Sequence, residues 1–217
     1  MAFRNHLVDR DFPARRVCIR GNDMNGLRGI LAAGWWLALV TWTTAIAIPG
    51  AAAMIAFTRL PPLGITMAGT EAYFAGDAEA SGRFVAGFVA NPLFAASDVV
   101  CFAAAAVAWI AMLGTRFRPC GEGFGRILAV IAVTLATVVL GWYLFLIGPP
   151  LAESLGTWRD AVLADDRPAA EAAWAIFDPL HEHASLALRI ELVLLIVAII
   201  AGGAATRIKS PATESDS

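Results

Sequence analysis

The stretch that decides the fold is ILAVIAVTLATVVLGWYLFLIG, residues 127–148, which contains no charged side chain. A helix that crosses a bilayer needs about 20 consecutive apolar residues, and this run supplies them. Lipid offers no hydrogen-bond partners to backbone N–H and C=O groups, so a spanning segment must satisfy those groups internally. Residues 127–148 are therefore predicted to form a transmembrane α-helix.

Three other runs have the same character, each with at most two charged residues: 30–57, 93–114 and 186–205. Over the whole chain 59% of residues are hydrophobic and 16% are charged, whereas soluble domains carry about 25% charged residues. The sequence predicts an all-α integral membrane protein, a bundle of four transmembrane helices. We expect its surroundings to be membrane lipid and not nucleic acid.

The alternative for the first run, residues 30–57, is a cleaved signal peptide, because AIA at 45–47 resembles a cleavage site. Its apolar core is far longer than the roughly 7–15 residues of a signal peptide, and many polar residues precede it. We therefore expect the first run to remain as a spanning helix.

Basic residues are distributed unevenly between the two sides of the predicted membrane. Eleven of the sixteen lie on the side of the termini: Arg4, Arg10, Arg15, Arg16, Arg20, Arg28, Arg116, Arg118, Arg126, Arg207 and Lys209. The positive-inside rule then places both termini in the cytoplasm. The predicted organisation is a basic cytoplasmic segment (1–28), a membrane domain (29–206) and a cytoplasmic tail (207–217).

Arginine is far more frequent than lysine in this chain, and alanine is abundant. This bias is typical of a GC-rich bacterial genome, so the expected location is the bacterial inner membrane. The two outer loops, residues 58–92 and 149–185, are acidic and contain aromatic residues. Such composition favours short amphipathic helices that lie on the outer membrane surface or cap the bundle.

Prolines mark the ends and one bend of the predicted helices. Pro61-Pro62 should end the first, and Gly148-Pro149-Pro150 should close the third. Pro49, inside the first, leaves the carbonyl of Ala45 without its helical donor. We expect a bend there, with a nearby threonine helping to satisfy that carbonyl: Thr41, Thr43 or Thr44.

Aromatic side chains lie towards the ends of the predicted spans: Trp35, Trp36, Trp109, Trp142 and Tyr143. Tryptophan and tyrosine are enriched where lipid meets water, because their rings are apolar and their N–H or O–H groups are polar. We expect these five residues to act as interfacial anchors.

Ionisable residues enter the last span in FDPLHEHASLALRIEL, residues 177–192. We expect this helix to begin near Asp178-Pro179, with Asp178 as its N-cap and both histidines helical. At about 3.6 residues per turn, His181 and Ser185 share one stripe. Arg189 and Glu191 flank that stripe on opposite sides, and His183 falls on the far side.

Asp98, Arg189 and Glu191 all lie a short distance inside the outer ends of their spans. A charged group in hydrocarbon is costly, and pairing offsets the cost. The sequence predicts an Asp98–Arg189 ion pair, with Glu191 reaching another partner or water in a polar pocket beneath His181. The alternative is that Arg189 and Glu191 extend to the membrane surface.

The candidate binding residues are therefore His181, Ser185, Arg189, Glu191 and Asp98. Cys101 lies one turn from Asp98, so His181, His183 and Cys101 are candidate ligands for copper. The alternative for these scattered residues is an ordinary structural role. Motifs of the CxxC, HExxH, GxSxG and phosphate-loop types are absent from the sequence.

Two short motifs carry a resemblance to a known family: FDPLHEHAS at 177–185 and PGAAAMIAFTRLP at 49–61. With four spans and both termini inside, the chain resembles the domain of unknown function 4149 family, which is related to transmembrane protein 205. The resemblance covers most of residues 30–205 and implies a four-helix membrane bundle, with Phe177, His181 and Ser185 as matching positions. The segment 59–92 is longer and more acidic than the family pattern.

More distantly, such bundles are similar to copper-resistance D-type transporters and to the membrane protoporphyrinogen oxidase, both of which use histidines on helices. Three functional hypotheses follow. The first is binding or passage of a small solute or metal ion at a polar outer-leaflet pocket. The second is a non-catalytic accessory subunit of a larger membrane complex, and the third is a haem or porphyrin oxidoreductase with His181 as ligand. The expected assembly is a homo-oligomer or a larger membrane complex.

Overall fold

The computed structural model describes residues 21–115 and 123–206, and all regular elements within them are helical. The elements in chain order are α1 (Gly21–Arg59), η1 (Pro61–Leu63), α2 (Glu71–Phe74), α3 (Ala78–Gly114), α4 (Phe124–Trp142), the π-helical turn η2 (Tyr143–Ile147), α5 (Gly148–Leu163) and α6 (Arg167–Thr206). The predicted all-α four-helix bundle is confirmed. Residues 1–20 of the predicted basic segment 1–28, and the predicted tail 207–217, lie outside the described residues.

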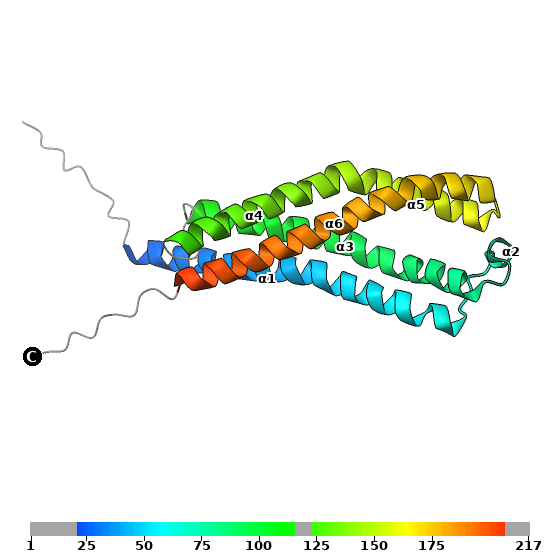
Figure 1. Ribbon diagram of the computed structural model, residues 1–217. Helices are drawn as coiled ribbons and strands as arrows, with labels where there is room; N and C mark the ends of the chain where they lie inside the picture. Colours follow the sequence, from blue (N-terminus) through cyan, green and yellow to red (C-terminus); the bar gives the residue numbers. More distant parts are fainter. Residues whose placement is uncertain (1–20, 116–122, 207–217) are drawn as a thin grey trace, which may run out of the picture.

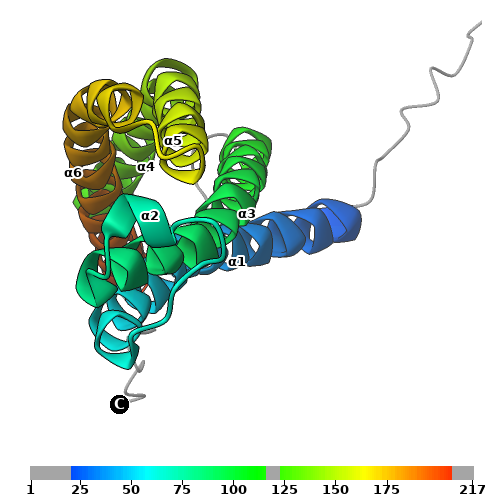
Figure 2. The same ribbon diagram turned by 90° about the vertical axis from the view of Figure 1, so that its right-hand side faces the viewer.

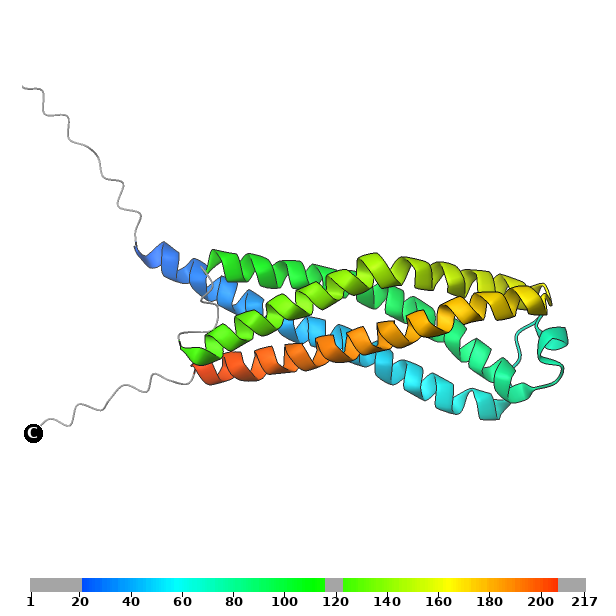
Figure 3. The same cartoon turned by 45° about the horizontal axis from the view of Figure 1, so that its top comes forward.

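The bundle consists of two helical hairpins placed side by side (Figures 1 and 3). In the first, α1 packs along α3; in the second, α4 and α5 pack along α6. The hairpins meet mainly through α1 and α6, whereas α3 and α4 hardly touch. Figure 2 looks along the bundle from the end that carries α2 and the α5–α6 turn, which we call the distal end.

Four helices are long and apolar enough to cross a membrane: Gly26–Leu63, Ala78–Gly114, Phe124–Leu163 and Arg167–Thr206. A helix of 40 residues measures about 60 Å at 1.5 Å per residue, twice the roughly 30 Å of hydrocarbon in a bilayer. The chain is thus a multi-pass membrane protein, and each helix extends well beyond the apolar layer.

The outer segments differ from the prediction of separate amphipathic helices, because most of their residues continue the spanning helices. α3 begins at Ala78 and α6 at Arg167, so α6 starts well before the predicted Asp178-Pro179. Asp166 caps α6 instead, accepting a hydrogen bond from the N–H of Ala169 at 3.1 Å.

These extensions have their own hydrophobic core, which we call the distal cap: Phe84, Ala161, Val162 and Ala170, with Met67, Tyr73, Phe74, Trp158 and Ala169 packed against them. Arg159 joins the two hairpins here, because its Nη2 donates to the carbonyl oxygen of Gly87 at 3.0 Å. Its guanidinium also lies 4.6 Å from the centre of the Phe88 ring. The outer segments therefore cap the bundle as helical extensions of the spans.

The prolines at 149 and 150 do not close the third helix, contrary to the prediction. The turn Tyr143–Ile147 before them is π-helical, and the N–H of Gly148 donates to the carbonyl oxygen of Tyr143. The wider turn places both prolines at the start of α5, where a missing N–H is tolerated. Pro61 and Pro62, by contrast, follow the end of α1 as predicted.

Small residues let the helices of each hairpin approach closely, as is common in membrane bundles. Ala104, Ala105 and Ala108 of α3 are buried against their neighbours. A Cβ atom on Gly125 of α4 would come within 2.6 Å of the carbonyl oxygen of Ala201 in α6. Glycine at 125 is therefore required by the closeness of α4 and α6.

Candidate functional site

The most deeply buried ionisable group in the described chain is the carboxyl group of Glu191, which is 0% exposed. Ala184, Ala187, Glu191 and Leu195 follow the i, i+3, i+7, i+11 spacing and form the buried stripe of α6. The helix therefore turns Glu191 into the bundle together with its alanines and leucines. Burying a carboxyl group is costly unless it is paired or hydrogen-bonded.

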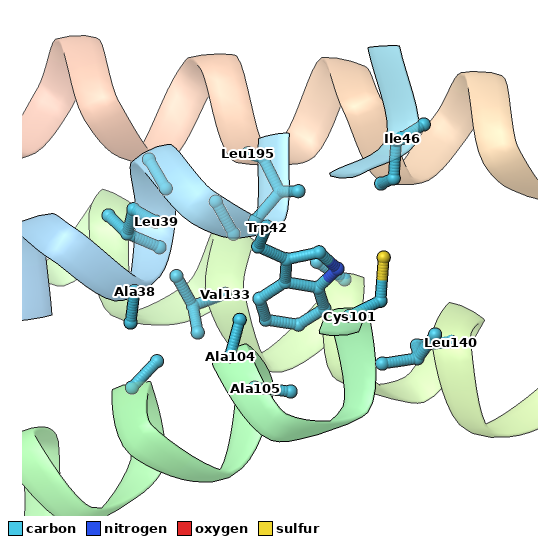
Figure 4. Packing of buried hydrophobic residues seen from close by; sticks show 14 of the residues in the cluster. Ala38, Leu39, Trp42, Ile46, Cys101, Ala104, Ala105, Val133, Leu140 and Leu195 are labelled. Carbon is cyan, nitrogen blue, oxygen red and sulfur yellow. The ribbon is translucent and has the colours of Figure 1, made fainter. Parts of the chain in front are cut away.

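The partner of Glu191 is Trp42 of α1, whose Nε1 donates to Oε1 at 2.5 Å. Trp35, Leu39, Trp42 and Ile46 form the buried stripe of α1. Figure 4 shows the Trp42 ring in this core, next to Cys101, Ala104 and Ala105 of α3. The other carboxyl oxygen of Glu191, Oε2, is buried and has no hydrogen-bond partner among the described residues.

The second carboxyl group of the interior belongs to Asp98 of α3, which is half-buried. Its Oδ2 accepts a hydrogen bond from the hydroxyl of Tyr143 at 3.3 Å. Tyr143 is buried and begins the π-helical turn, so the prediction that it anchors the helix at the membrane surface is wrong. Wide turns of this kind are frequent at functional sites.

Ser97 and Cys101 complete the polar groups on this part of α3. Ser97 Oγ donates to the carbonyl oxygen of Ala45 at 2.5 Å and lies 3.8 Å from Cys101 Sγ. Ala45 is the residue whose carbonyl Pro49 deprives of its helical donor. The expected threonine is not used: Thr43 and Thr44 bond the carbonyls of their own helical turns instead.

We call Trp42, Asp98, Tyr143 and Glu191 the polar cluster. Its members come from α1, α3, the π-helical turn and α6, so both hairpins contribute. Asp98, Tyr143 and Glu191 lie at one depth, about one and a half turns inside the predicted ends of their spans. Its two hydrogen bonds join Trp42 to Glu191 and Tyr143 to Asp98.

The predicted Asp98–Arg189 ion pair does not form. Arg189 is exposed, and the ion pair found among residues 21–115 and 123–206 joins Arg83 to Glu79 in the distal part of α3. The reason is helical geometry, since residues two apart on a helix point in nearly opposite directions. Once α6 turns Glu191 into the bundle, Arg189 must face outwards, where its long side chain can reach the membrane surface.

His181, predicted to lie over a polar pocket, is exposed in the structure, and so is His183. The His181 ring stacks on the buried Phe177, with 5.3 Å between ring centres. His183 Nδ1 donates to the carbonyl oxygen of Pro179 at 2.6 Å, and Ser185 is half-buried. The confirmed feature is that both histidines are helical.

The three candidate copper ligands, His181, His183 and Cys101, are not brought together. Cys101 is 2% exposed in the bundle core, whereas both histidines face outwards on α6. In the part of the chain that the structure describes, no group of three or more His, Cys, Asp or Glu side chains is placed to hold a metal ion.

Sequence reasoning identified Asp98 and Glu191 but missed their partners, Trp42 and Tyr143. A signal was present for Trp42, which lies seven residues after Trp35 and three after Leu39 on the apolar stripe of α1. No comparable signal marked Tyr143, because its burial depends on the π-helical turn. No protein-family model matches the sequence, and no curated protein or solved structure shows significant similarity to it.

Proposed function

We propose that this membrane protein binds and passes a small solute at its polar cluster, and that Asp98 and Glu191 take the positive charge of that solute. The observation that carries the proposal is the Oε2 atom of Glu191, which is buried and has no partner. An orphaned polar atom is rare in protein interiors and needs an explanation. A ligand that approaches Oε2 would supply one.

The partners of the two carboxyl groups are neutral, since both hydrogen bonds come from aromatic side chains, Trp42 and Tyr143. Neither carboxyl group forms an ion pair with a described residue. A charged side chain in the hydrocarbon layer raises the free energy of membrane insertion, by about 2.5–3.5 kcal/mol when it lies at the centre. A proton or a small cation that the chain does not itself provide would offset that cost.

The location also supports passage. The two carboxyl groups belong to different hairpins, and those hairpins contact each other mainly through α1 and α6. Ionisable groups inside membrane bundles commonly mark the route of an ion or a proton. We further propose the bacterial inner membrane with both termini in the cytoplasm, as the arginine distribution predicts. The proposal uses neither histidine, and the family resemblance remains a prediction.

The test is cation uptake by proteoliposomes under a potassium diffusion potential, with a trapped pH-sensitive dye for protons and isotope counting for sodium and ammonium. We expect uptake of at least one of these cations, and at least a tenfold loss in Glu191→Gln. The matched control is Glu182→Gln, which makes the same change at an exposed position of α6. Uptake equal to that of empty liposomes for all three cations, or an unaffected Glu191→Gln protein, would contradict the proposal.

A further inference from the structure

Two hydrogen bonds link α3 to the helix that follows it, and they lie at different levels of the bundle. Trp109 Nε1 donates to Thr137 Oγ1 at 2.9 Å, and the Tyr143 hydroxyl donates to Asp98 at 3.3 Å. Between these levels α3 and α4 make few contacts. A recess of about 210 Å³ opens there, walled by residues of α3, α4 and the π-helical turn.

The wall of the recess is apolar, with Phe102, Ala105, Leu140 and Leu144 among its residues. The hydrogen-bonding side chains in the wall are Trp109 and Thr137, and these bond each other. Phe102 and Phe145 also belong to the wall and are 57% and 71% exposed. Within a membrane span, exposed aromatic side chains face lipid, so the recess opens sideways into the bilayer.

Asp98 is not part of the wall, but it lies on α3 one turn before the wall residue Phe102, on the distal side. Asp98, Phe102, Ala105 and Trp109 follow the i, i+4, i+7, i+11 spacing, which places them on one stripe of α3. Asp98 is half-buried and therefore partly accessible, and it forms no ion pair with a described residue. The stripe thus begins at a carboxyl group and continues as an apolar wall for about 16 Å.

We propose that the recess admits a lipophilic amine from the membrane, with its ammonium group on Asp98 and its apolar part between α3 and α4. This inference rests on the proposed function, because it makes the recess the entrance to the polar cluster. The carboxyl group favours a positively charged ligand, and the apolar wall favours a ligand with a hydrocarbon chain. Glu191 lies at the same depth as Asp98 and is fully buried, and its unpartnered Oε2 offers a second acceptor inside the bundle.

The test measures binding of radiolabelled dodecylamine to the protein in phosphatidylcholine nanodiscs, with empty nanodiscs subtracted. Dodecanol is the matched competitor, since it has the same chain and no charge. We expect saturable binding that dodecanol does not displace. Asp98→Asn should weaken binding at least tenfold.

A second variant tests the recess independently of the carboxyl group. Gly141 lies in the wall, and a Cβ atom there would meet nothing within 4 Å, so Gly141→Leu can fold and fill the recess. We expect it to weaken binding at least tenfold. Gly34→Leu makes the same change on α1, also with open space around it, and should bind as the wild type does.

Three outcomes would overturn the inference. Equal binding by Asp98→Asn would mean that no charge is recognised. Displacement by dodecanol would make the recess a site for any hydrocarbon chain, and loss of binding in phosphatidylethanolamine nanodiscs would make an aminophospholipid headgroup its occupant. Failure of the proposed function looks different: the protein would bind dodecylamine and pass no cation.

Discussion

Ser97 of α3 donates a hydrogen bond of 2.5 Å to the carbonyl oxygen of Ala45 in α1, the group that Pro49 leaves without its helical donor. A side chain of α3 thus supplies the hydrogen bond that the proline in α1 removes. This hydrogen bond joins α1 to α3 at the level of the polar cluster. It also satisfies the carbonyl group that Pro49 leaves free, so the proline is tolerated inside α1.

Replacing Ser97 with alanine should therefore leave the carbonyl of Ala45 unsatisfied in a water-free interior. We expect a loss of about 1–3 kcal/mol in the free energy of unfolding, measured by denaturant titration in detergent micelles. The control is the double variant Ser97→Ala with Pro49→Ala, in which residue 49 regains an N–H that can bond Ala45. A double variant as unstable as Ser97→Ala alone would contradict this account.

Replacing Trp42 with phenylalanine removes the donor to Glu191 and leaves a buried carboxyl group without any partner. We expect a loss of about 1–3 kcal/mol, which the additional change Glu191→Met should largely reverse, because it removes the orphaned group as well. Both effects can be read from unfolding curves of the purified proteins.

Trp35→Phe is the matched control for that experiment, since Trp35 is equally buried on the same stripe of α1. Within the described part of the chain its Nε1 has no hydrogen-bond partner, so the same change should cost less than at position 42. Equal losses at the two positions would show that ring volume, and not the hydrogen bond to Glu191, determines the effect.

Adding a methyl group at Gly125 should disturb the contact between α4 and α6, because the new Cβ would lie within 2.6 Å of a backbone oxygen. We expect Gly125→Ala to lower the unfolding free energy by about 1–3 kcal/mol. Gly34→Ala has open space and should be neutral or raise it by up to about 1 kcal/mol, as alanine favours helix. The prediction fails if the two variants are equally stable.

The orientation of the chain can be tested with single cysteines in a variant that lacks its natural ones. Ala164, exposed in the α5–α6 turn, and Thr206, exposed at the end of α6, mark opposite ends of the bundle. A maleimide that does not cross membranes should label Ala164→Cys in cells with a permeabilised outer membrane, and Thr206→Cys only after lysis. The reverse pattern would contradict cytoplasmic termini.

The helices and their apolar runs could be predicted from the sequence, because twenty uncharged residues in lipid have one way to satisfy their backbone. The continuation of α3 and α6 into the distal cap could not, since Pro92 and Pro179 suggest helix ends. Tertiary packing overrides those local signals. Phe84, Trp158 and Trp174 form successive ring contacts that hold the extended ends together.

For the candidate site, the sequence identified the two acidic residues but not their surroundings. The positions of Asp98 and Glu191 within apolar runs were enough to single them out. Choosing Arg189 as a partner failed, because the direction in which α6 faces its neighbours is set by all its small residues together. Composition within one helix does not reveal which of two flanking charges will be turned inwards.

The π-helical turn at Tyr143–Ile147 contains one residue more than the same length of regular α-helix would. One additional residue changes the direction of every later side chain around the helix axis by about 100°. The faces of α4 and α5 therefore cannot be read from one continuous helical wheel. A homologue without this turn should carry a one-residue deletion between 143 and 147. An alignment that put the gap after Trp158 would pair Trp158 with the residue next to its true counterpart, a side chain on the wrong side of the helix.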